Sequence, residues 1–95
     1  MTRKVDYEVQ KQLFKAVLEL KDVDEVEKFF VDLCTITEIY SLSQRFEVAR
    51  MLRKDKTYLN IAEETGASTA TISRVNRALN YGNNMYNEML DRMGL

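Results

Sequence analysis

The sequence predicts an all-α protein of about six short helices. Its 95 residues include no proline and only three glycines, so few positions interrupt a helix. Apolar residues recur at spacings of three and four in several segments, which is the pattern of amphipathic helices. The composition, with 45% hydrophobic and 31% charged residues, is typical of a folded soluble domain. Because so short a chain cannot bury two independent cores, we expect a single domain over residues 1–95, stabilised further by dimerisation.

The N-terminal half is predicted to form three helices. The first extends over Val5–Leu20, where apolar residues recur at helical spacing. Asp22 is expected to cap the second helix, because its carboxylate can accept a hydrogen bond from a free amide of the first turn. Thr37 is expected to cap the third, which ends at Arg53 and Lys54.

A helix-turn-helix is predicted over residues 57–80, with its core between Tyr58 and Arg77. Gly66 separates its two helical patterns at a point where a tight turn needs a positive φ angle. Ala62 is small enough for the second helix to approach the first closely. The apolar contacts between the two helices are expected from Ile61, Ile72 and Val75. This pair of helices, joined by a short turn, is the arrangement found in many DNA-binding proteins.

The outer side of the second motif helix carries side chains that suit DNA. Ser68 is expected to cap this helix, which leaves free backbone amides and the positive end of the helix dipole near a phosphate. Arginine can bind guanine through two hydrogen bonds, and hydroxyls can contact bases or phosphates. The candidate DNA-binding residues are Ser68, Thr69, Ala70, Thr71, Ser73, Arg74 and Arg77. Arg53, Lys54 and Lys56, just ahead of the motif, are candidates for contacts to backbone phosphates.

The charge is distributed unevenly along the chain. The formal net charge is −1, but residues 44–80 carry seven basic and four acidic residues, whereas residues 1–43 carry six and nine. A basic segment on an acidic body is expected of a DNA-binding protein. The alternative to DNA binding is that the motif residues only build a corner between two helices, whose polar face is then exposed to solvent.

A last helix is predicted over residues 83–93, after the break at Tyr81 and Gly82. Its methionines could pack on a partner chain or fill the core, and the sequence does not separate these roles. The tyrosines and phenylalanines are interpreted as core or dimer-interface residues. A further alternative to DNA binding is a protein-interaction module that keeps the helix-turn-helix as a scaffold and binds through its aromatic and methionine surfaces. The weak net basic charge of the motif segment supports this alternative.

The motif region resembles the Trp repressor superfamily, in particular its YerC/YecD-type branch. The matching residues are Gly66-Ala-Ser-Thr-Ala-Thr-Ile-Ser-Arg74, Asn76, Leu79 and the preceding Ser43-Gln-Arg45. The resemblance implies a Trp repressor-like, intertwined homodimer, with residues 1–54 as the dimerisation helices. It also implies that the dimer presents two recognition helices to successive major grooves of double-stranded DNA. This docking geometry is known from the repressors of the family and is implied only by the resemblance. It implies a sequence-specific transcriptional regulator, expected to be a repressor.

The same resemblance bears on a small-molecule effector. In Trp repressor the corepressor indole lies between two arginines, which correspond to Arg45 and Arg74. Val75 stands where the family has a glycine that leaves room for the ligand, and Ala78 replaces a ligand-contacting serine. We therefore do not expect tryptophan to bind, whereas a different effector stays open. The alternative role for Arg45 is an ion pair with Glu47 or Glu38.

Enzymatic activity is not expected. The chain has no histidine and a single cysteine, and it lacks a glycine-rich phosphate loop, so the usual catalytic, metal and cofactor sites are missing. No apolar run approaches the roughly 18 residues of a membrane span, and no signal-peptide core is visible. We expect a cytoplasmic protein without membrane contact, associated with the bacterial nucleoid when bound to DNA. The operator and target genes do not follow from the sequence.

Overall fold

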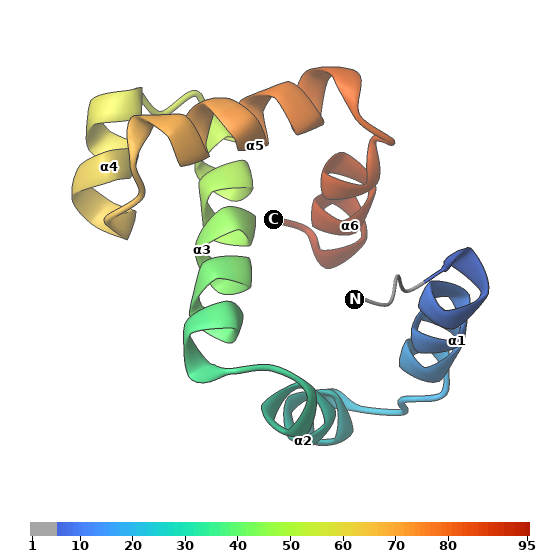
Figure 1. The fold of residues 1–95 in the computed structure, drawn as a ribbon. Helices are drawn as coiled ribbons and strands as arrows, with labels where there is room; N and C mark the ends of the chain where they lie inside the picture. Colours follow the sequence, from blue (N-terminus) through green and yellow to red (C-terminus); the bar gives the residue numbers. More distant parts are fainter. Residues whose placement is uncertain (1–5) are drawn as a thin grey trace. The chain divides into compact units, whose positions relative to one another are not determined.

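The computed structural model describes residues 6–95, which form six α-helices and no strand (Figure 1). The helices are α1 (Tyr7–Leu18), α2 (Val23–Leu33), α3 (Ile36–Arg53), α4 (Tyr58–Thr65), α5 (Thr69–Tyr81) and α6 (Met85–Met93). The predicted all-α class and the predicted order of the helices are confirmed. By their internal contacts the described residues divide into two compact units, one up to Ile36 and the other over Thr37–Leu95.

The first unit contains α1 and α2, each of which begins at an aspartate cap. The Asp6 carboxylate accepts a hydrogen bond from the Val9 amide at 3.1 Å, and the Asp22 carboxylate accepts one from the Glu25 amide at 2.9 Å. The predicted cap at Asp22 is therefore confirmed. The first helix ends at Leu18, two residues earlier than predicted, and Val5 lies outside the described residues. Neither helix contains a buried residue.

The predicted cap at Thr37 is wrong, because α3 already begins at Ile36. The chain leaves α2 at Cys34, whose amide still donates to the Phe30 carbonyl at 2.8 Å and whose own backbone is extended. The next helix starts two residues after Cys34, sooner than the sequence pattern indicates. Thr37 thus lies inside the first turn of α3.

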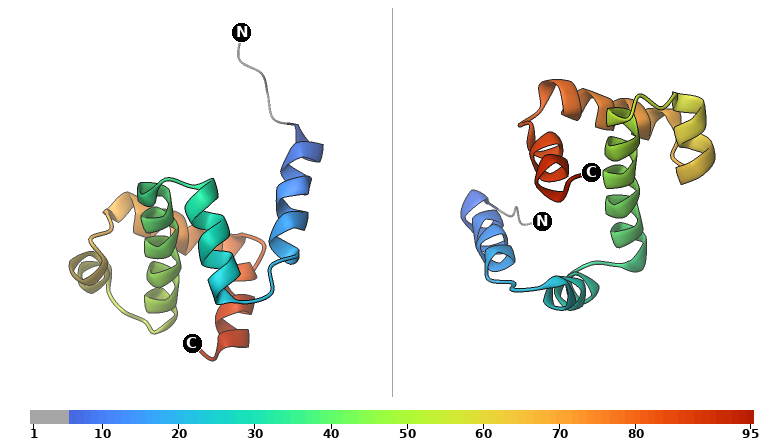
Figure 2. Two further views of the ribbon diagram at one scale, coloured as in Figure 1. Left: turned by 90° about the horizontal axis from the view of Figure 1, so that it is seen from below. Right: turned by 180° about the vertical axis from the view of Figure 1, so that it is seen from behind.

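The second unit is organised around α5. Figure 1 and the right-hand view of Figure 2 show that α5 crosses the C-terminal part of α3. The helix α4 lies at one end of α5 and α6 at the other. All four helices and the turn between α4 and α5 contribute to one core. Its buried residues are Val48, Ala49, Met51, Ile61, Ala67, Ile72, Val75 and Leu90. The predicted packing role of Ile61, Ile72 and Val75 is confirmed.

The connection from α5 to α6 requires a glycine at position 82. A Cβ atom on Gly82 would lie 2.5 Å from the carbonyl oxygen of Ala78, too close for any side chain. The break predicted at Tyr81 and Gly82 is confirmed, because α5 ends at Tyr81 and the backbone of Gly82, with φ −88° and ψ −152°, is extended. Asn84 then adopts a positive φ of 65°, and α6 begins at Met85 rather than at residue 83.

Candidate nucleic-acid interface

The turn between α4 and α5 has the geometry that the sequence predicts. Gly66 has a φ angle of +73°, in the left-handed region that favours glycine, and its amide donates to the Ala62 carbonyl at 2.9 Å. Two residues later the Ser68 hydroxyl accepts a hydrogen bond from the Thr71 amide at 3.1 Å. Both the turn at Gly66 and the cap at Ser68 are confirmed, and together they fix where the predicted recognition helix starts.

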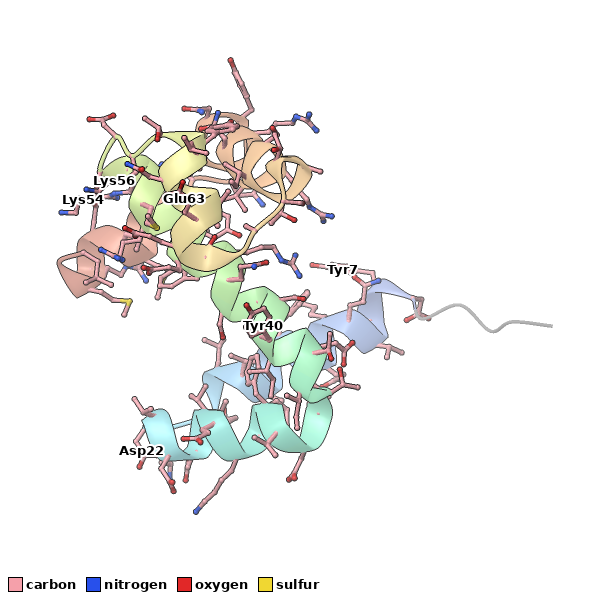
Figure 3. All side chains as sticks on the ribbon, turned by 90° about the vertical axis from the view of Figure 1, so that its left-hand side faces the viewer. Tyr7, Asp22, Tyr40, Lys54, Lys56 and Glu63 are labelled. Carbon is pink, nitrogen blue, oxygen red and sulfur yellow. The ribbon has the colours of Figure 1, made fainter. Side chains whose placement is uncertain are left out.

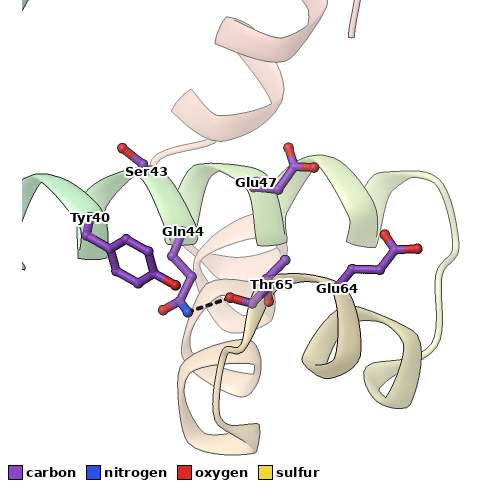
Figure 4. Close-up of a pocket in the computed structure, with 6 residues that line it drawn as sticks. All are labelled: Tyr40, Ser43, Gln44, Glu47, Glu64 and Thr65. Atoms are coloured by element: carbon purple, nitrogen blue, oxygen red, sulfur yellow. Dashed lines mark hydrogen bonds between the residues drawn. The ribbon is translucent and has the colours of Figure 1, made fainter.

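Thr65 holds the turn through three hydrogen bonds. Its hydroxyl donates to the Ile61 carbonyl at 2.6 Å and accepts from the Ala67 amide at 3.1 Å. Its carbonyl accepts from the side-chain amide of Gln44 on α3 at 2.9 Å, a bond drawn in Figure 4. The turn is therefore braced both within itself and against α3.

The candidate DNA-binding residues of α5 extend from its cap at Ser68 to Arg77, and none of them belongs to the buried core. Ile72 and Val75 are almost fully buried, at 0% and 1% exposed, and anchor the opposite side of the helix. The exposed members of the predicted set are Ser68, Thr69, Ala70, Arg74 and Arg77, and the partly exposed members are Thr71 and Ser73. The structure thus leaves five of the predicted residues open to a ligand and two partly open.

The three basic residues ahead of the motif separate into two groups. Lys54 and Lys56 are exposed on the connection between α3 and α4, where Figure 3 shows their side chains extending outward. Arg53 instead points to α6, where its guanidinium donates to the Asn87 carbonyl at 3.0 Å and to the Asp91 carboxylate at 2.7 Å. The expected phosphate contact by Arg53 is therefore replaced by a clamp between α3 and α6.

Arg45 and Arg74 line one cavity, together with Ser41, Gln44 and Thr71. Its volume is about 240 Å³, and its lining is mostly polar. The Arg45 Nε donates to the Ser41 carbonyl at a long 3.4 Å. Val75 does not line this cavity, because its side chain lies in the core. Two guanidinium groups on one cavity wall can bind a carboxylate or another anionic group.

Glu47, the residue considered as a partner for Arg45, pairs with Arg50 instead. Two hydrogen bonds join these side chains, at 2.8 and 2.6 Å. The hydrogen bond to Arg50 is the main cause that lowers the pKa of Glu47, and partial burial opposes it. The predicted ion pair of Arg45 with Glu47 is therefore not formed, and Arg45 lines the cavity with Arg74.

Gln44 and the clamp partners of Arg53 had no role in the sequence interpretation. Gln44 was visible only as part of the Ser43-Gln-Arg45 match. Its one useful signal is its place four residues before Val48, on a helix whose next turn is buried. Nothing local marks Asn87 or Asp91, which lie 34 and 38 residues from Arg53.

Residues 6–95 include neither a membrane-spanning helix nor a cluster of metal-binding side chains. No helix in this range is both long and apolar enough to cross a membrane. The same range holds no group of three or more histidine, cysteine, aspartate or glutamate side chains that could bind a metal ion.

Comparisons with known proteins give the family. The sequence model described as "Trp repressor protein" matches residues 8–94. The chain is 65% identical over 82 residues to the uncharacterised protein YerC of Bacillus subtilis (strain 168), a match that covers 86% of this chain and 79% of YerC. A solved TrpR-like protein from Eubacterium eligens ATCC 27750 is 64% identical, with a TM-score of 0.89 and coverage of 95% of this chain and 92% of that one. A solved protein from Staphylococcus aureus, described as a candidate Trp repressor, is 50% identical, with a TM-score of 0.89 and coverage of 94% and 89%. This chain therefore belongs to the Trp repressor protein family, a family of helix-turn-helix regulators.

Proposed function

We propose that the protein is a sequence-specific, double-stranded DNA-binding transcriptional regulator that represses by occupying its site as a homodimer. The observation that carries the proposal is α5 itself. Its inner side is anchored by Ile72 and Val75, whereas its capped start and the two arginines, Arg74 and Arg77, are exposed. A helix anchored in this way can enter the major groove without losing its own packing.

Charge supports the same role. The segment 44–80 carries three more basic than acidic residues, although the whole chain has a net charge of −1. Lys54 and Lys56 are exposed and suit contacts to phosphates, which add affinity for any sequence. The capped start of α5 adds free backbone amides and the positive end of the helix dipole. Arg74 and Arg77 are the candidates for reading bases.

The homodimer is supported by the surface of α1 and α2. Neither helix buries a residue within the chain, and both carry large apolar side chains that are more than half exposed. The most exposed of these are Tyr7, Val9, Phe14, Leu18, Val23 and Val31. Soluble proteins rarely leave so many apolar groups in water, so a second copy of residues 1–54 is the proposed cover.

The cavity lined by Arg45 and Arg74 favours a second candidate function, a regulator gated by a small effector. The two guanidinium groups would select a ligand with a carboxylate or another anionic group. Such a ligand would raise the melting temperature of the folded protein, because it binds only that state.

Binding to duplex DNA tests the main proposal. A duplex selected from genomic fragments and a random duplex of equal length are titrated with wild type, Arg74→Ala, Arg77→Ala and Lys56→Ala. We expect each arginine variant to lose about 1 to 3 kcal/mol on the selected duplex and much less on the random one. Lys56→Ala should weaken both duplexes alike. Arg92→Ala, which removes an exposed arginine of α6 outside the motif, is the matched control.

Two outcomes would contradict the proposal. If wild type retains no duplex even at low salt, where phosphate contacts are strongest, DNA binding is excluded. If the arginine variants lose equal affinity for selected and random duplexes, α5 does not read sequence.

A further inference from the structure

The last carbonyls of a helix have no partner within the helix, and α4 ends next to the predicted recognition helix. The Thr65 carbonyl belongs to this group, because it lies in the last residue of α4, immediately before Gly66. Its partner comes from another helix, since the Gln44 side-chain amide on α3 donates to it at 2.9 Å. The bond joins residues that are 21 positions apart, so it fixes tertiary and not local geometry.

The geometry points to Gln44 as the positioning residue that sets the orientation of α5 for DNA, an inference that rests on the proposed function. Thr65 is already fixed to α4 and to Ala67 by its hydroxyl. The Gln44 bond adds the link from this turn to α3, so the direction in which the chain enters α5 is tied to α3. Figure 4 shows the Gln44 side chain extending from α3 to the turn, with Tyr40 beside it.

The surroundings of Gln44 strengthen this assignment. Gln44 lines the cavity of Arg45 and Arg74, and it also lines a second cavity of about 280 Å³ together with Tyr40, Ser43, Glu47, Glu64 and Thr65. The side chain therefore lies between two cavities on its way to the turn. The turn also packs on the core through Ala67, which is 4% exposed, so the Gln44 bond adds a polar link to α3 beside that apolar packing.

Loss of one such bond has a modest effect that is specific to recognition. A neutral hydrogen bond of this kind changes an equilibrium by about three- to ten-fold. Because Val48, Ile61 and Ile72 remain packed, the unit should stay folded without it. The loss should fall on the selected duplex, which requires a fixed orientation of α5, and much less on random DNA, which is held through phosphates.

The test uses the full chain and the two duplexes described above. Gln44→Met keeps the length and apolar packing of the side chain and removes the donor. We expect it to bind the selected duplex about three- to ten-fold more weakly than wild type, with random-duplex affinity unchanged. Amide exchange should become about three- to ten-fold faster at Gly66 and Ala67 and stay unchanged at Ile72. Tyr40→Phe, which removes the neighbouring hydroxyl and leaves the Gln44 bond intact, should behave as wild type.

A pH profile gives a readout that loss of packing would not move. In Gln44→Glu the carboxylate cannot donate to the Thr65 carbonyl, whereas the protonated acid can. Binding of the selected duplex, relative to wild type, should therefore recover as the pH falls from 7 to about 4.5. Ser41→Glu places the same charge on the cavity wall without reaching the turn, so recovery beyond that of Ser41→Glu reports the restored donor.

The possible failures are distinguishable. A wild type that binds no duplex overturns the proposed function, and this inference with it. A wild type that binds, with Gln44→Met equally tight and equally protected at Gly66 and Ala67, overturns only the role of Gln44. Faster exchange throughout the unit, with equal losses on both duplexes, also overturns it, because Gln44 would then act on folding alone.

Discussion

The two units of the chain treat their apolar residues in opposite ways. In α3 to α6, eight hydrophobic residues are buried to 4% exposure or less, and they come from all four helices and the turn. In α1 and α2 no residue is buried, although Phe14 is 56% exposed and Val23 81%. Both regions have the same helical spacing of apolar residues. Taken by itself, the helix-turn-helix unit therefore has its own core, whereas the unit formed by α1 and α2 has none.

The largest effect is expected from cutting into the core of the second unit. Ile61→Ala removes a side chain that is 0% exposed, so the lost burial and the remaining cavity should cost about 2 to 5 kcal/mol of unfolding free energy. Urea unfolding followed by circular dichroism measures this loss. Leu59→Ala, on the same helix but with a side chain that is 69% exposed, is the matched control and should change little. Equal losses for the two variants would mean that the core is not where the structure has it.

A smaller effect, of another kind, is expected in the first unit. Phe14→Ala removes an aromatic group that the proposed second copy would cover, which is worth about 1.5 to 3 kcal/mol when fully buried. The dimer dissociation constant should rise by about ten- to hundred-fold, as measured by sedimentation over a range of protein concentrations.

Gln12→Ala, two positions away on the same helix, is the control for Phe14→Ala, because it removes a polar side chain that is exposed. A wild type that is monomeric at all concentrations would contradict the proposed dimer. Phe14→Ala would then act, if at all, through the stability of the monomer, and α1 and α2 would have no partner copy.

Local features of the fold could be predicted from the sequence, because each is decided within one helical turn. Asp22 and Ser68 bond to amides three residues ahead, and Gly66 alone supplies the left-handed turn. Thr37 was predicted wrongly because any threonine before an apolar stripe has the pattern of a cap. In the structure α2 ends at Leu33 and α3 already begins at Ile36, so Thr37 lies within the helix.

The parts that could not be predicted depend on partners far along the chain. Arg53 has the pattern of a solvated helix end, and only the folded chain brings it to Asp91, 38 residues away. Gln44 reaches the turn in the same way, across 21 residues. Helical spacing also gives no sign of which apolar stripe is buried within the chain. A sequence pattern fixes the face of a helix, but not the surface that this face meets.

The smallest effect is expected on the melting temperature, from the ion pair between Glu47 and Arg50 at the surface of the second unit. Glu47→Gln removes the ion pair with Arg50, both of whose side chains are partly exposed, so the melting temperature at pH 7 should fall by only about 1 to 2 °C. The pKa of Glu47 is lowered in the folded state from its usual 4.5, mainly by the hydrogen bond to Arg50. The pair therefore stabilises the protein above pH 4.5, and this contribution is lost as the pH falls through the lower, folded-state pKa.

Wild type and Glu47→Gln should melt together below that pKa, as followed by circular dichroism from pH 7 to pH 3. Glu63→Gln, which removes an exposed carboxylate from α4 (Figure 3), should show no such pH-dependent difference, and an equal response from both variants would assign the effect to net charge and not to the pair.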